Sequence, residues 1–189
     1  MINIKKTATL LTILLLSALG VGACSDRGDS SPLPDFSIYT DVKQKKTAFF
    51  NYIFPLVEEQ NQLIRAQRVR LLDLAETTIE SLNNEDQNFI EELSGYYKVD
   101  IEQPNKIVIN ELLLRVDEVP ASLALAQAAM ESAWGTSRFA VQANNLFGQW
   151  CYQEGCGLVP LRRNPGSKHE VAKFDSVSDA IRSYLRNIN

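Results

Sequence analysis

The sequence predicts a mainly α-helical protein with a small β lobe near its C-terminal end. Hydrophobic residues recur at three- and four-residue steps through most of residues 43–143 and again after residue 176, which is typical of amphipathic helices. Between residues 144 and 174 this period is lost, and glycines and prolines separate short apolar runs. The chain of 189 residues is 45% hydrophobic and 22% charged, which suits one globular domain with tails.

The first segment is typical of an export signal. Lys5 and Lys6 precede an apolar run over residues 10–21, which ends in small residues before Cys24. This run is shorter than the roughly 20 residues that a membrane-spanning helix needs. We therefore interpret residues 1–23 as a signal peptide, with an uncleaved N-terminal anchor as the alternative.

The order Val21-Gly22-Ala23-Cys24 resembles the bacterial lipoprotein lipobox, which implies lipidation of Cys24. Acyl chains contribute roughly 0.8 kcal/mol per buried methylene, so they would hold the protein on a membrane. Ser25 follows the cysteine, and by resemblance to enteric sorting rules this favours the outer membrane. We expect lipid anchoring on the periplasmic side of the cell envelope, with ordinary secretion as the alternative.

Two segments precede the C-terminal part. Residues 24–42 are rich in Ser, Asp, Gly and Pro and predict a flexible tether. Residues 43–103 predict a helical-hairpin arm, in which Pro55 should break or restart the first helix and Asn83-Asn84 makes the turn. We interpret the arm as packing against the C-terminal part, with docking of a partner as the alternative.

Residues 104–189 predict a compact unit. A helix over residues 107–116 is followed by a helix from Pro120 to Trp134, and Gly135 is expected as its left-handed cap. Thr136 is then expected to cap a short helix that ends at Ala143.

A β-hairpin lobe follows, with its turn at residues 164–167. The last helix opens with Ser176 and Asp179 at the spacing of a capping box, and its apolar face runs to Ile188.

Two cysteines fall in the lobe. In an exported protein Cys151 and Cys156 are expected to form a local disulfide, with a thiol nucleophile assisted by His169 as the alternative. One histidine and no second cysteine pair give no expectation of a metal site or a cofactor. With 19 basic and 23 acidic residues and no basic stripe, nucleic-acid binding has no support either.

The densest chemical signal is a single carboxylate at the end of an alanine-rich helix. This helix is apolar nearly all round, so we expect Glu131 to be buried, with Met130 and Trp134 as an apolar wall. Burial and the helix C-terminus both favour the uncharged acid, the form that a general acid for glycoside cleavage needs. The alternative is that Glu131 points to solvent or pairs with Arg138.

The surroundings of Glu131 carry a resemblance. Residues 119–140 resemble the Bax-type bacterial proteins of the flagellar rod hydrolase-like N-acetylglucosaminidase group, glycoside hydrolase family 73. The likeness continues through residues 144–151, 155–160, 169–171 and 183–189, and the arm from about residue 47 is similar too.

The resemblance implies a lysozyme-like α lobe and a small β-hairpin lobe with a cleft between them. It also implies hydrolysis of the β-1,4 bond after N-acetylglucosamine in peptidoglycan, with Glu131 as proton donor. Asn145 and Phe147 would line the groove, and we add Trp134 as a substrate contact. A second carboxylate would activate water, and we favour Glu170, at the start of a lobe strand, over Glu154.

Two other functions stay open. A lytic transglycosylase would use the same fold but form an anhydro product, and a non-catalytic envelope lipoprotein would only bind glycan or a partner. Family members continue beyond the region of Asn189 with a tyrosine near the cleft, so we expect a domain shortened at this end.

Overall fold

The computed structural model describes residues 32–164 and 166–189. The predicted signal peptide, the lipobox-like order and Cys24 lie outside the described residues.

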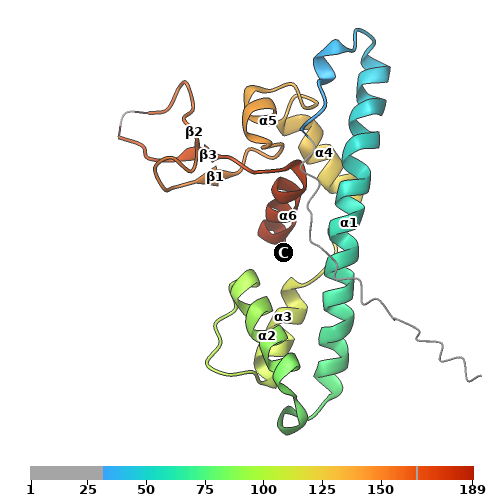
Figure 1. Ribbon diagram of the computed structural model, residues 1–189, viewed down its shortest axis with the longest axis vertical. Coiled ribbons are helices and arrows are strands. Elements are labelled where there is room, and N and C mark those ends of the chain that lie inside the picture. Colours follow the sequence, from blue (N-terminus) through green and yellow to red (C-terminus); the bar gives the residue numbers. More distant parts are fainter. Residues whose placement is uncertain (1–31, 165) are drawn as a thin grey trace, which may run out of the picture.

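Helix α1 (Val42–Glu76) forms the long axis of the molecule (Figure 1). Asp41 caps it by accepting a hydrogen bond from the Gln44 N–H at 2.7 Å. The expected break at Pro55 is wrong, because the helix continues through this residue. Pro55 is exposed, whereas Ile53 and Val57 on either side are fully buried, so packing offsets the cost of about 3 kcal/mol that proline imposes on a helix interior.

The other elements pack along α1 in two groups. Helices α2 (Asn84–Tyr97) and α3 (Lys106–Arg115) lie at one end, while α4 (Ala121–Glu131), α5 (Arg138–Ala143) and the β lobe lie at the other. Helix α6 (Val177–Ile188) lies between the groups, and α1 contacts α3, α4 and α6 (Figure 1). One hydrophobic core runs through both groups, so the arm packs on the C-terminal part as expected.

Short polar signals set the helix ends. Asn83 and Ser176 cap α2 and α6, and the Ser176 hydroxyl also donates to Asp179 at 2.7 Å, which confirms the expected turn and capping box. Pro120 stands at the N-cap of α4, one position before its expected place. Ile188 is 48% exposed, so the apolar face of α6 ends earlier than expected.

The β lobe is a three-stranded antiparallel sheet, not a simple hairpin. Strands β1 (Trp150–Cys151), β2 (Gly157–Leu158) and β3 (Glu170–Ala172) lie in the order β1-β3-β2. Val171 pairs with both Trp150 and Leu158. The Ser167 N–H donates to the Asn164 carbonyl at 3.1 Å, at the expected turn. The predicted mainly α, lysozyme-like class with a small β lobe is confirmed, although β1 was not expected.

The described part of the expected tether is not free. Phe36, in the short helix η1 (Phe36–Ile38), is only 2% exposed, and its ring lies 5.4 Å from that of Phe49. The expectation of a flexible tether is therefore wrong for residues 32–41. Burial of the Phe36 ring holds this segment against the core, although its neighbours in sequence are mostly polar.

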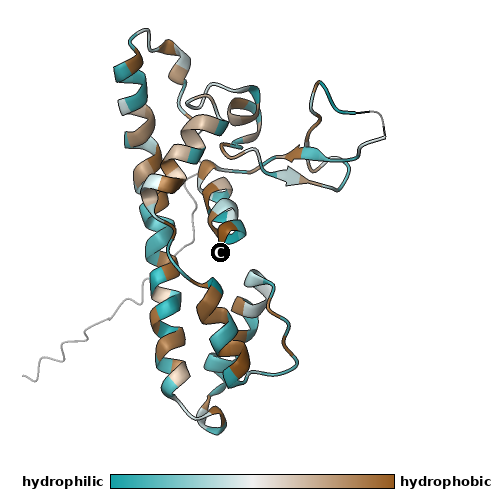
Figure 2. Ribbon diagram, turned by 180° about the vertical axis from the view of Figure 1, so that it is seen from behind, coloured by the Kyte–Doolittle hydropathy of each residue, from teal (hydrophilic) through white to brown (hydrophobic). Residues whose placement is uncertain are grey.

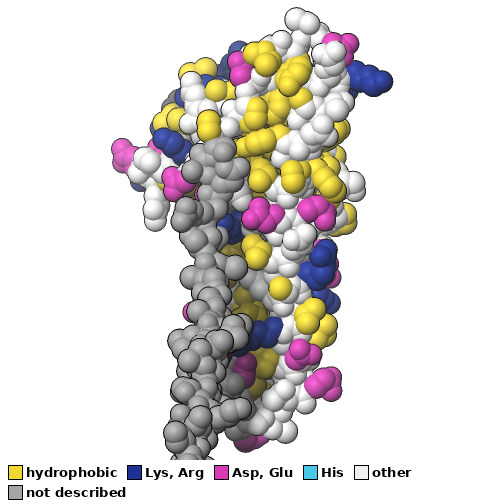
Figure 3. Space-filling model, turned by 45° about the vertical axis from the view of Figure 1, so that its right-hand side comes forward, with side chains coloured by type: hydrophobic (Ala, Val, Ile, Leu, Met, Phe, Trp, Pro, Cys, Tyr) yellow, Lys and Arg dark blue, Asp and Glu magenta, His cyan; other side chains and the backbone are white. Residues whose placement is uncertain are grey.

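Hydrophobic residues also reach the surface. Helix α3 is hydrophobic over most of its length (Figure 2) and buries Val108, Ile109 and Leu112. On the face in Figure 3, hydrophobic side chains gather toward the upper end. Within the described residues, no helix combines the length and apolar character needed to cross a membrane.

Candidate active site

Glu131 is the last residue of α4, and its side chain is exposed. The expectation of a buried carboxyl is therefore wrong. Helix α4 buries only one stripe, formed by Ala124, Ala128 and Ala129, and Met130 is 78% exposed. Alanine favours helix regardless of its surroundings, so an alanine-rich pattern does not by itself indicate burial on all sides.

A tight left-handed turn ends α4 three residues before the expected end. Ala133, Trp134 and Gly135 have φ angles of 51°, 59° and 75°. Gly135 is left-handed as expected, but the two L-residues before it carry a cost of about 1–2 kcal/mol each. The buried Ser132 hydroxyl secures the turn, because it accepts from the Gly135 N–H at 2.7 Å and donates to the Ala128 carbonyl at 2.6 Å.

The cap of the next helix differs from the expectation. Ser137, not Thr136, accepts the hydrogen bond from the Ala140 N–H, at 3.2 Å. The Thr136 hydroxyl instead donates back to the Ala133 carbonyl at 2.7 Å. Both hydroxyls therefore hold the backbone that follows Glu131.

Glu131 faces the segment that begins at Asn145. Its Oε2 atom lies 3.7 Å from the position that a β-carbon at Gly148 would occupy. Arg138 donates to Gln142 and to the Val159 carbonyl, and no ion pair joins it to Glu131 in the described part of the chain. The alternative of an Arg138 pair is thus not realised, and the carboxylate is open to a ligand.

Asn145 is placed inside the fold rather than in a groove. It is 1% exposed, and its amide donates at 2.8 Å to the carbonyls of both Gln149 and Ala172. Its oxygen accepts from the N–H groups of Phe147 and Gln149. The expected contact with substrate does not fit, because all four hydrogen-bonding positions of the amide are used within the chain.

The two predicted aromatic contacts also serve packing. Phe147 is 9% exposed and stacks on Tyr184 of α6, with ring centroids 4.0 Å apart. Trp134 packs edge-on against Phe49 and Phe50 of α1. Phe147 is therefore held against α6 and Trp134 against α1.

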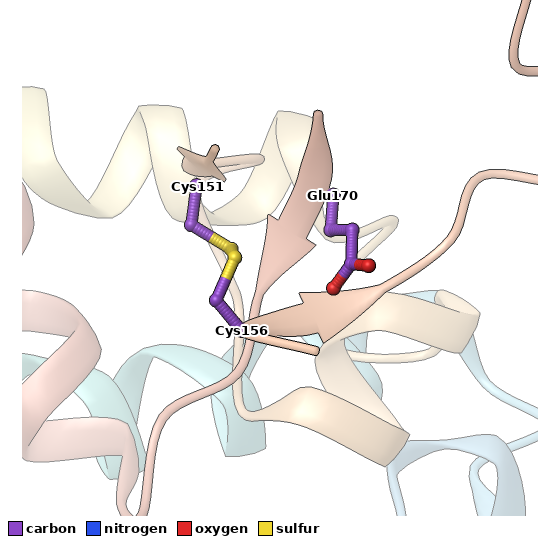
Figure 4. A group of neighbouring side chains, drawn as sticks. All are labelled: Cys151, Cys156 and Glu170. Carbon is purple, nitrogen blue, oxygen red and sulfur yellow. A yellow bond between two sulfur atoms is a disulfide. The ribbon is translucent and has the colours of Figure 1, made fainter. Parts of the chain in front are cut away.

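Glu170 turns into the β lobe (Figure 4). It is 4% exposed, and its carboxylate accepts from the N–H groups of Gly157 at 2.8 Å and Gly155 at 3.2 Å. The expectation that it overhangs the cleft is therefore not met. Glu154 in the same loop is exposed, and both carboxylates line a hollow of about 480 Å³.

The disulfide between Cys151 and Cys156 is present, with their Cα atoms 6.2 Å apart (Figure 4). It occupies both thiols, so the structure offers no thiol nucleophile for His169 at this position. The two sulfur atoms and the Glu170 carboxylate lie within 4.8 Å of one another, but the bonded sulfurs are not thiolate ligands. His169 lies beside Trp150, with ring centroids 4.0 Å apart.

Comparison with known proteins identifies the segment around Glu131. Residues 110–189 match the family model Glucosaminidase, described as mannosyl-glycoprotein endo-beta-N-acetylglucosaminidase. The protein bax of Escherichia coli (strain K12) is 33% identical over 161 residues, which cover 85% of this chain and 56% of that protein. The chain thus spans about half the length of the curated relative. No solved structure gives a significant match. The chain is thus similar to the glucosaminidase family over residues 110–189 and to protein bax over a longer stretch.

Proposed function

We propose that this protein hydrolyses peptidoglycan glycan at the β-1,4 bond after N-acetylglucosamine, with Glu131 as the general acid. The observation that carries the proposal is the position of Glu131, an exposed carboxylate on the last residue of α4 beside Gly148, within the segment that matches the glucosaminidase family. The turn held by Ser132 fixes the backbone directly after it.

The exposure of Glu131 changes how the acid would work. Water surrounds the exposed carboxyl in the free protein, so a bound sugar, and not the fold alone, has to exclude it. A sugar lying over Glu131 would displace water from around the carboxyl. Glu131 would then donate its proton to the glycosidic oxygen while water attacks the anomeric carbon.

The second carboxylate is a separate question. Glu170 already accepts two main-chain hydrogen bonds, so we assign it the task of holding the lobe. Glu154 is exposed and lies in the same loop as the disulfide, which makes it the lobe carboxylate that is free to orient water.

The experiment is digestion of purified sacculi with mass analysis of the soluble products. Glu131→Gln should lower release about a hundredfold or more, because a positioned acid contributes at least this much. Glu59→Gln is the matched control. It makes the same chemical change at an exposed position of α1, far from Glu131 in the sequence, and should leave release unchanged. Products with reducing N-acetylglucosamine ends support the hydrolase, whereas anhydro products would show a transglycosylase.

The exposed Glu131 and the occupied Glu170 also favour a second candidate, a glycan-binding protein without turnover. In that case the wild-type protein and Glu131→Gln would bind sacculi equally and release nothing.

We further propose that Cys24 is lipidated and anchors the protein in the cell envelope, most simply at the outer membrane. The support is the Val21-Gly22-Ala23-Cys24 order and the Ser25 that follows it. Mass analysis of the N-terminal peptide should show acyl groups on Cys24. Cys24→Ser should move the protein out of the membrane fraction, and Ser25→Asp should shift it toward the inner membrane. An unmodified Cys24 in a membrane-free protein would contradict the proposal.

A further inference from the structure

The C-terminal ends of α2 and α6 lie beside α1 (Figure 1). Residues of these three helices line a groove. It consists of two adjoining hollows, of about 190 and 290 Å³, that share Tyr96, Tyr97 and Arg186. We call it the cationic groove and define it by Tyr96, Tyr97, Lys98, Arg115, Arg182 and Arg186.

The groove is positively charged in a chain whose net charge is −4. No side-chain carboxylate is among the described residues that line either hollow. Arg115 and Arg182 have acidic partners, Glu111 at 2.7 Å and Asp179 at 3.4 Å. Within the described chain, Lys98 and Arg186 have no carboxylate within 4.0 Å. Two of the four cations are thus unpaired.

Arg186 has the features of an anion-binding side chain. Its Nε atom is buried without a hydrogen-bond partner in the described part of the chain, and its guanidinium lies 5.2 Å from the Tyr96 ring centre. In the described part of the chain no hydrogen bond or ion pair uses the Arg186 guanidinium, which lines both hollows, so its terminal nitrogens are available to an oxyanion. The planar fork of arginine suits a carboxylate, which can accept two parallel hydrogen bonds.

A short series of contacts links the groove to the candidate active site. Asn187 lines the second hollow and donates to the Gln149 side chain at 3.1 Å. Gln149 directly follows Gly148, which borders Glu131. A ligand at Glu131 that carries a side branch could therefore place this branch over the end of α6.

We propose that the cationic groove binds a carboxylate-bearing peptide. Resting on the proposed function, this peptide is the stem peptide of peptidoglycan, which is attached to the glycan and carries free carboxylates. The apolar side chains of Leu63, Ile64 and Leu185 line the first hollow and would contact the peptide's aliphatic parts. Arg186 and Lys98 would bind its carboxylates.

The test measures binding and cleavage separately with the full chain. Calorimetry uses a free stem peptide, the same peptide with amidated carboxylates, and inorganic phosphate. Digestion uses sacculi and peptide-free glycan. We expect the stem peptide to bind, amidation to weaken it about tenfold, and Arg186→Gln to weaken it similarly, since a hydrogen bond to a charged group has this value. In digestion, Arg186→Gln should raise KM on sacculi and leave cleavage of peptide-free glycan unchanged.

Two further variants distinguish a loss of peptide binding from a loss of folding. Lys98→Gln removes the second unpaired cation at an exposed position and should weaken peptide binding in the same direction. Arg162→Gln makes the Arg186 change at an exposed position outside the groove and should have no effect. Thermal unfolding of each variant checks the fold.

The outcomes separate the two proposals. Peptide binding that depends on Arg186, without cleavage of any substrate, supports the groove and overturns the proposed function. Cleavage with no peptide binding, or with binding that is equal in Arg186→Gln and wild type, overturns the groove alone. Binding of phosphate but not of the stem peptide also overturns it, because the site would then select a different anion.

Discussion

The Oε2 atom of Glu131 lies 3.7 Å from the point where a β-carbon at Gly148 would stand, so the candidate acid rests against a residue with no side chain. Gly148 has a φ of 64°, a left-handed conformation that L-residues adopt at a cost. Glycine at this position therefore allows both the backbone turn and the room beside the carboxylate.

Gly148→Ala should destabilise the folded protein by about 1–2 kcal/mol, because an L-residue such as alanine is strained at a positive φ. It should also lower the release of fragments from sacculi, since the new methyl group contacts Glu131. Urea unfolding and the digestion assay measure the two effects. Gly95→Ala is the matched control: Gly95 lies in α2 with nothing within 4 Å, so alanine should stabilise the protein by about 0.5–1 kcal/mol. Unchanged stability and release in Gly148→Ala would contradict the arrangement.

Gly135→Ala should be more damaging. A β-carbon there would stand 2.5 Å from Cδ2 of Phe36, and the φ of 75° adds the left-handed cost. Overpacking contributes about 1–3 kcal/mol beyond the left-handed term. The measurement is a double-mutant cycle with Phe36→Leu, which shortens the opposing side chain. The steric part should shrink in the double variant, whereas strict additivity would show that η1 does not pack on this turn.

The features that were predicted correctly from the sequence are determined by residues close to one another in the chain. The caps at Asn83 and Ser176, the left-handed Gly135 and the local Cys151–Cys156 disulfide are each decided within a few positions. Their signals are therefore visible in the chain itself.

The errors concern contacts between distant segments. Helix α1 continues through Pro55, and Phe36 is buried, because of packing that the sequence pattern does not show. The same holds for the site. The family resemblance selects Glu131, but only coordinates show that it is exposed and that Asn145 is internally satisfied. The cationic groove joins residues 96–98 to residues 182–189, and no local motif indicates such a pairing.

Glu170→Gln should destabilise the protein by about 1–3 kcal/mol, because it weakens the hydrogen bonds from Gly155 and Gly157 to a buried carboxylate. Guanidinium unfolding measures this change. Glu154→Gln alters an exposed carboxylate in the same loop and should leave stability within about 0.5 kcal/mol of wild type. Loss of turnover in Glu170→Gln with unchanged stability would instead assign Glu170 a direct part in catalysis.

Alkaline pH should weaken the fold through Tyr97. Burial raises the pKa of the Tyr97 phenol from 10.0 to about 12, and its hydroxyl donates to Gln67 Oε1 at 3.4 Å. The unfolded chain releases this proton first, so the stability contribution is complete below pH 10 and is lost as the pH rises from 10 toward 12. Burial also raises the pKa of Tyr96 and Tyr184, which adds to the same trend.

Urea unfolding at a series of pH values should therefore show stability falling more steeply over this range in wild type than in Tyr97→Phe. Tyr152→Phe removes the phenol of a tyrosine that is 77% exposed and is the matched control. Lysines also titrate at this pH, but they are common to all three proteins and cancel in the comparison. Equal slopes in wild type and Tyr97→Phe would show that the Tyr97 phenol is as open to water in the folded protein as in the unfolded chain.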